Sequence, residues 1–151
     1  MFEADPLLQD YVQYRLVRAN RLGRYKHERG ALSEEICPCI LSLGDWEEVQ
    51  SHPQVARINA ANSHLPGPDS LMRYKVSDAS YLAEFKWWKK MELGFKDAYR
   101  DLTRGYGKIW ARRIDMSAGA IVGLLDWDPE SPRGRLHTAK VSLGATRRNS
   151  Q

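Results

Sequence analysis

The stretch YGKIWARRIDMSAGAIVGLL, residues 106–125, carries most of what the sequence says about the fold. It begins as an arginine-rich amphipathic segment, breaks at residues 115–117, and continues with small and apolar residues. Ser117 is a favourable residue for the start of a helix. Ile121 and Leu125 are four residues apart, which places them on one helix face. The stretch therefore predicts two short helices joined by a tight turn.

The residues around the turn follow a recognisable order. Small or apolar side chains would line the first helix, Asp115 would sit at the turn, and Met116 would fill the gap between the helices. From Ala111 onward the pattern resembles the helix-turn-helix of sigma-factor region 4 and related regulators, although Asp115 stands where that family usually has glycine. The residues that carry the resemblance are Ile109, Ala111, Ile114, Asp115, Met116, Ser117 and Ile121.

The resemblance implies binding to double-stranded DNA. The second helix would enter the groove with small residues, and cations on either side of it would contact phosphates, which position a protein without specifying sequence. The implied DNA-binding residues are Lys108, Arg112, Arg113, Ser117, Ala118, Gly119, Ala120, Arg133 and Arg135.

A small helical protein with such a motif is similar to late-gene regulators of tailed bacteriophages. These include the lambdoid Q antiterminators and the RinA-like and ArpU-like activators. The resemblance implies a transcription regulator that engages bacterial RNA polymerase or a sigma factor. The alternative is a protein-interaction module that binds a host factor without reading DNA.

The charge distribution agrees with a polyanionic partner. The formal net charge is only +4, but residues 1–79 carry 9 Lys or Arg against 11 Asp or Glu, whereas residues 80–151 carry 14 against 8. A basic half of this kind is typical of polyanion binding, although a solvated basic surface gives the same count. The start of the chain lacks the pattern of a signal peptide, and no apolar run is long enough to span a membrane. We expect a cytoplasmic protein.

The remaining periodicity predicts an all-α fold. A helix should begin at Asp5-Pro6, and it carries the basic stripe Arg15, Arg18, Arg21 and Arg24. Short helices follow up to residue 62, with Pro38 limiting one of them. A second long helix is predicted from Ser80, because large residues recur at multiples of three or four. We expect a helical N-terminal region at 5–62, a linker at 63–77 and a helix-turn-helix region at 78–144, and an oligomer is possible.

Few residues suggest catalysis or a bound metal ion. Cys37 and Cys39 could bind zinc with His27 and His52, but their spacing differs from that of structural zinc sites. The acidic segment DWDPE, residues 126–130, could hold Mg²⁺, yet Asp128-Pro129 is more typical of a solvated turn. The prediction is a protein that is not an enzyme, with no cofactor, no metal ion and no catalytic residues.

Overall fold

The computed structural model describes residues 1–51, 68–87, 91–104 and 119–141. The elements in these ranges are, in chain order, β1 (Phe2–Glu3), α1 (Pro6–Arg21), α2 (Tyr25–Ser42), β2 (Trp46–Ser51), β3 (Ser70–Tyr74), β4 (Ala79–Trp87), α3 (Met91–Arg104), β5 (Gly119–Asp126) and β6 (Arg133–Val141). The prediction of an all-α protein is therefore wrong. A mixed sheet forms the centre of the molecule.

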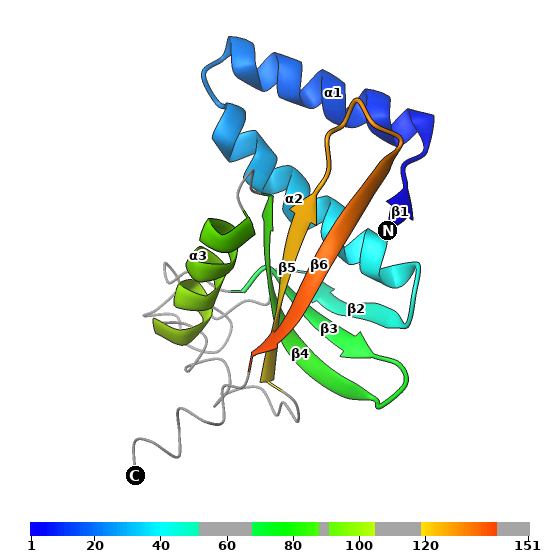
Figure 1. The fold of residues 1–151 in the computed structure, drawn as a ribbon, viewed down its shortest axis with the longest axis vertical. Helices are drawn as coiled ribbons and strands as arrows, with labels where there is room; N and C mark the ends of the chain where they lie inside the picture. Colours follow the sequence, from blue (N-terminus) through cyan, green and yellow to red (C-terminus); the bar gives the residue numbers. More distant parts are fainter. Residues whose placement is uncertain (52–67, 88–90, 105–118, 142–151) are drawn as a thin grey trace.

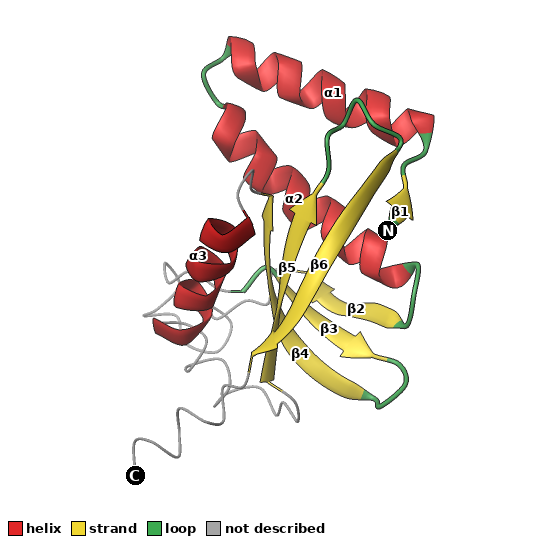
Figure 2. Ribbon diagram, in the orientation of Figure 1, coloured by secondary structure: helices red, strands yellow, loops and turns green. Residues whose placement is uncertain are grey.

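The strands form one sheet in the order β1-β6-β5-β4-β3-β2. β2, β3 and β4 form an antiparallel meander, β4 pairs with β5 in parallel, and β6 returns antiparallel to β5. The parallel pair needs a crossover connection, and α3 lies within it. Figure 1 and Figure 2 show α1 and α2 on one side of the sheet and α3 on the other.

The two faces of the sheet have different roles. On β4, Ala83, Phe85 and Trp87 point into the main core, which α1 and α2 close with Val12, Leu16 and the buried residues of α2. Since successive side chains of a strand alternate between faces, Glu84 and Lys86 point to the other face, toward α3. The fold thus places a buried acid and a lysine next to each other outside the main core.

α1 begins where the sequence predicts a helix, whereas α2 does not end at the proline that was expected to limit it. The Asp5 carboxylate accepts a hydrogen bond from the Leu7 amide (2.7 Å), and Pro6 begins α1 as predicted. Pro38 was expected to limit a helix, but α2 continues through it. Ile36, Cys37 and Leu41 are buried beside it. Tertiary packing of this face therefore outweighs the backbone hydrogen bond that proline cannot donate.

Two segments predicted as helices are strands. The helix expected from Ser80 begins only at Met91, and residues 79–87 form β4. The second helix of the predicted helix-turn-helix is strand β5, in which Ile121 and Leu125 lie in the core. Both errors have one cause, because a spacing of four keeps two residues on the same face of a strand as well as of a helix. The predicted first helix and turn, residues 108–117, lie outside the described residues.

The sheet includes strands from both sides of the predicted linker. β3 lies inside the predicted linker at 63–77, whose first residues are not described. β1 from the N-terminus pairs with β6 near the end of the described chain. None of the helices within the described ranges is long and apolar enough to cross a membrane.

A glycine on β6 provides a test of the packing. A Cβ on Gly134 would lie 2.6 Å from Phe2 Cζ and 2.7 Å from Trp127 Cδ1, and both rings are buried. We predict that Gly134→Ala lowers the free energy of unfolding by about 1–3 kcal/mol, as expected when a packed core is overfilled.

Gly30→Ala is the matched control. Gly30 lies inside α2, and nothing is within 4 Å of the position of its Cβ. Alanine there should raise the free energy of unfolding by up to about 1 kcal/mol. Urea unfolding of the two variants measures both effects, and equal stability of the variants would contradict this packing.

Candidate functional site

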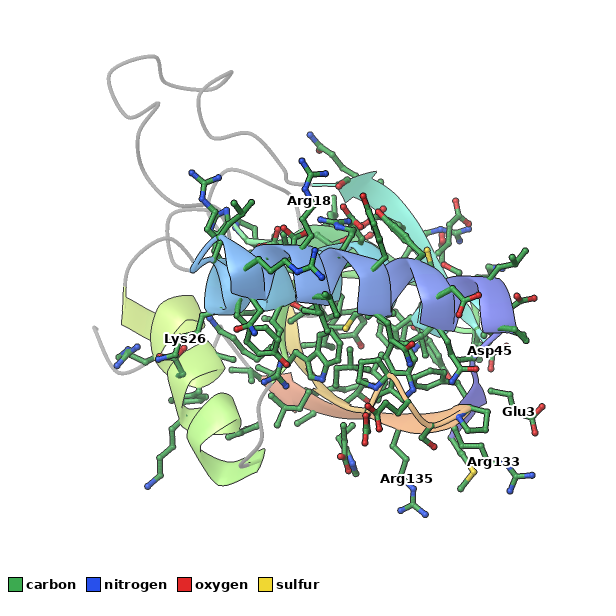
Figure 3. All side chains as sticks on the ribbon, turned by 90° about the horizontal axis from the view of Figure 1, so that it is seen from above. Glu3, Arg18, Lys26, Asp45, Arg133 and Arg135 are labelled. Atoms are coloured by element: carbon green, nitrogen blue, oxygen red, sulfur yellow. The ribbon has the colours of Figure 1, made fainter. Side chains whose placement is uncertain are left out.

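Four of the predicted DNA-binding residues lie within the described ranges, on two strands of the sheet. Gly119 and Ala120 are part of β5, and Ala120 is fully buried, so it is not available to a DNA groove. Arg133 and Arg135 are exposed on β6 and project to the side away from α1 (Figure 3). The others lie outside the described residues: Lys108, Arg112, Arg113, Ser117 and Ala118.

A different group of polar residues gathers where β3 begins. Asp69 directly precedes β3, and its amide donates a hydrogen bond to the Ala83 carbonyl (3.0 Å). Its carboxylate oxygen Oδ2 accepts a hydrogen bond from the Phe85 amide (2.7 Å). The Asp69 side chain therefore joins the ladder between β3 and β4, which fixes its position at the sheet.

Glu84 and Lys86 complete the group from the neighbouring strand. Ser70 is the register partner of Ala83, so the next step of the antiparallel ladder sets Asp69 opposite Glu84. Glu84 is only 5% exposed. Lys86 Nζ lies 3.6 Å from Glu84 Oε1. The pattern is a Pro68-Asp69 pair at the start of one strand and Glu84-Phe85-Lys86 on the next.

A second acid reaches the group from α2. A hydrogen bond joins the carboxyl groups of Glu34 and Asp69, which requires a proton on one of them. Glu34 is separated from Asp69 by the whole of β2 and by residues outside the described ranges. Only the packing of α2 against the sheet brings the two acids together.

The burial of this group changes its acid–base chemistry. Loss of solvent raises the pKa of Asp69 to about 9, and the negative charges of Glu84 and Glu34 act in the same direction, while the Phe85 amide opposes them. Asp69 therefore carries a proton at neutral pH. Burial also raises the pKa of the Cys37 thiol, to which the charge of Asp69 contributes. A strongly perturbed acid of this kind is a common mark of a functional site.

Helix α3 supplies the partner of the lysine. Lys86 Nζ lies 3.2 Å from Asp97 Oδ2, and Asp97 is also paired with Arg100 one turn further on. The side chains of Lys86 and Asp97 are 21% and 23% exposed. The ammonium group is thus held between Glu84 and Asp97 at the margin of the buried acids, where it still reaches solvent.

The face around Lys86 is open toward β6 and carries acids as well as cations, since Asp126 Oδ2 lies 3.5 Å from His137 Nε2 and Glu3 Oε1 lies 3.8 Å from Arg133 Nε. Lys86 is the register partner of Leu124 in the parallel pair of β4 and β5. Leu124 is in turn the partner of His137 in the antiparallel pair of β5 and β6. Phe95, Val122, Leu124 and His137 line an open pocket between α3 and these strands. Because Gly134 and Leu136 face the core, Arg133 and Arg135 share the open face with His137.

The structure does not assemble a metal site from the described residues that the sequence suggested for zinc or Mg²⁺. Cys37 is buried and Cys39 is exposed, so the two thiols point in different directions, and His52 lies outside the described residues. In the acidic segment, Asp128 Oδ1 accepts a hydrogen bond from the Glu130 amide (3.0 Å) in an exposed turn.

The sequence did not predict the group at β3 and β4, because its patterns placed Asp69 in a linker and Glu84 and Lys86 on a helix.

Comparison with protein-family models finds no matching family, and comparisons with curated proteins and with solved structures find no match.

The raised pKa of Asp69 predicts a pH dependence of stability. Folding raises this pKa from its ordinary value of 3.8 to about 9, so the folded state binds the proton more tightly than the unfolded chain does. Between these values the free energy of unfolding must fall as the pH rises. Asp69→Asn keeps hydrogen-bonding atoms at the site but cannot ionise. The variant should therefore lack the fall in the free energy of unfolding that ionisation of Asp69 causes.

Urea unfolding in a chelator, at about pH 5 and about pH 9, measures the effect. We expect the wild type to lose at least about 1 kcal/mol more than Asp69→Asn over this interval. Asp45→Asn, at an exposed position between α2 and β2, is the control and should follow the wild type. Parallel pH profiles for the wild type and Asp69→Asn would contradict a protonated buried Asp69.

Proposed function

We propose that this protein is a metal-dependent phosphodiesterase that hydrolyses nucleic acid. The observation that supports it is the meeting of Asp69, Glu84 and Lys86 where β3 and β4 pair, with Glu34 reaching Asp69 from α2. Carboxylate oxygens are the ligands that Mg²⁺ and Mn²⁺ prefer. This function differs from the sequence-based prediction of a transcription regulator that is not an enzyme. No comparison tests that prediction.

The acids fit a divalent cation because burial disfavours their negative charge, which a cation would offset. Three carboxyl groups interact, and one of them keeps a proton far above its ordinary pKa. Over the described ranges, no three His, Cys, Asp or Glu side chains are placed so that they could hold a metal ion, so the acids would have to move closer together as the ion binds. A cation would therefore replace the proton between Asp69 and Glu34, and binding would release it to solvent.

Each residue of the group has a role in hydrolysis. A divalent cation would polarise the phosphate and make bound water a stronger nucleophile. Asp69 and Glu84 would hold it, and Glu34 would orient Asp69. The Lys86 ammonium would orient the attacking water and stabilise the negative charge that develops on the phosphate. Hydrolysis breaks one P–O bond and adds the hydroxyl of water to phosphorus and its proton to the leaving oxygen.

The distribution of charge favours a nucleic acid over a small phosphodiester. Residues 80–151, which contain β4, α3, β5 and β6, carry the excess of Lys and Arg. Arg133 and Arg135 lie exposed on the open face that also carries His137 and Lys86. A row of exposed cations leading to a reactive centre is what a long phosphate backbone requires.

The second candidate is DNA binding without catalysis, in a transcription regulator. Exposed Arg133 and Arg135 on β6 favour it, since they are available to phosphates whether or not the acids bind a metal ion. The two candidates differ in one observable, which is whether bound nucleic acid is cut.

The test is cleavage of labelled single-stranded and double-stranded DNA and RNA with Mg²⁺ or Mn²⁺. We predict cutting with either ion and none in excess chelator. Lys86→Met, Asp69→Asn and Glu84→Gln should each lower the rate by about 100-fold or more, because each removes a charge that acts on the phosphate or holds the metal ion.

Lys75→Met is the matched control for the lysine, because Lys75 is exposed in the turn after β3. It should cut at the wild-type rate. Binding of all substrates without cutting, in both metal ions, would instead favour the second candidate. Cutting that survives the chelator or the Glu84→Gln change would show that these acids do not form the reactive centre.

A further inference from the structure

The outer face of α1 carries large apolar side chains in solvent. Leu7, Tyr14 and Val17 are 78%, 66% and 54% exposed, whereas Val12, Leu16 and Ala19 on the opposite face are buried. At 3.6 residues per turn, the exposed residues form a stripe about 120° wide that is centred on Tyr14. The members of this outer stripe are Leu7, Asp10, Tyr11, Tyr14, Val17, Arg18 and Arg21.

The arginines of α1 do not form one phosphate-binding row. Arg15 is turned toward α2, where it is paired with Glu28 and Glu35 and donates a hydrogen bond to the Tyr11 hydroxyl (2.6 Å). Arg18 and Arg21 remain exposed within the outer stripe, and Figure 3 labels Arg18 at the surface of α1. A surface for a polyanion would not combine these cations with an acid and three exposed apolar side chains.

The order of charges along the stripe is complementary to itself. Asp10 lies four residues before Tyr14, and Arg18 lies four residues after it. Each is therefore about 6 Å from Tyr14 along the helix axis, in opposite directions. If the two helices cross at about 50°, so that the Asp10–Tyr14–Arg18 rows of both copies run side by side, a two-fold axis between the two Tyr14 side chains would set Asp10 of one copy opposite Arg18 of the other, twice.

We propose that the outer stripe of α1 binds a second copy of this chain, with the two helices running in opposite directions and crossing at about 50° at Tyr14. Such an interface is isologous, since the same patch serves both partners. Tyr14 and Val17 provide its apolar centre, and the two Asp10–Arg18 pairs fix the register. The hydrogen bonds of the Tyr11 hydroxyl with Arg15 and Glu35 hold that ring in place before the partner arrives.

The association is weak and depends on concentration. A single pair of helices buries an area at the low end of specific interfaces, and association must also offset the loss of free motion of two molecules. We therefore expect dissociation constants from about 1 to about 100 μM. The proposal is independent of the proposed function, because Asp69 and Glu84 lie at β3 and β4 and take no part in the stripe.

The test is sedimentation velocity over a concentration series, with a charge exchange between the two helices. Asp10→Arg alone and Arg18→Asp alone each set like charges opposite each other, and each should weaken the dimer by about tenfold or more. The double variant Asp10→Arg/Arg18→Asp restores opposite charges in the reverse order and should recover most of the affinity.

Asp45→Arg is the matched control for charge, because Asp45 is exposed in the turn between α2 and β2 and is not part of the outer stripe. It should dimerise like the wild type. Circular dichroism and thermal unfolding verify that each variant folds, as expected for exposed positions.

Three results would overturn the proposal. They are a wild type that stays monomeric at the highest concentration, a dimer that neither single change weakens, and a double variant as weak as the singles. If the wild type is monomeric and Arg18→Asp instead weakens binding of labelled DNA or RNA, the stripe contacts nucleic acid rather than a second copy.

Discussion

The carboxyl group of Asp69 is buried at a junction of three elements, and its contacts hold the candidate site together. Its Oδ2 accepts a hydrogen bond from the Phe85 amide of β4, its own amide donates one to the Ala83 carbonyl, and Glu34 of α2 is hydrogen-bonded to it. A buried acid is costly unless it is neutral or paired with a cation. In the described arrangement the proton provides neutrality, and we propose that a divalent ion does so in the active protein.

The crossover through α3 positions the other half of the site. Because β4 and β5 are parallel, the chain must leave the end of β4 and return beside it, and α3 lies on the open face in this connection. That geometry brings Asp97 within 3.2 Å of Lys86 Nζ. Helices on opposite faces of the sheet therefore contribute to one group of side chains, with Glu34 on α2 and Asp97 on α3.

The sequence predicted α1 because its signals are local. Asp5 and Pro6 mark its start, and its buried residues repeat only with a helical period. The strands were missed because their signals were ambiguous. Tyr81 and Phe85, like Ile121 and Leu125, are four residues apart, which suits both periods. The alternation of Tyr81, Ala83, Phe85 and Trp87 along β4 was the stronger signal, and it also separates Glu84 and Lys86 onto the other face.

The site itself required the fold. Pro68 and Asp69 follow a segment rich in proline and glycine, so the sequence favoured a linker there. Nothing local connects Glu34, Asp69 and Lys86, because their meeting depends on the packing of α2 and on the pairing of β3 with β4. Arg133 and Arg135 were singled out from the sequence for their charge, and they are exposed on the face that carries Lys86.

Calorimetric titration with Mn²⁺ at about pH 7, in two buffers of different ionisation enthalpy, tests the central claim most directly. If the cation replaces the proton on Asp69, binding should release close to one proton per ion, and the Asp69→Asn variant should lose both the binding and the release. Wild-type protein that takes up no Mn²⁺ at millimolar concentration, or that binds it equally well with Asn at position 69, would contradict the account.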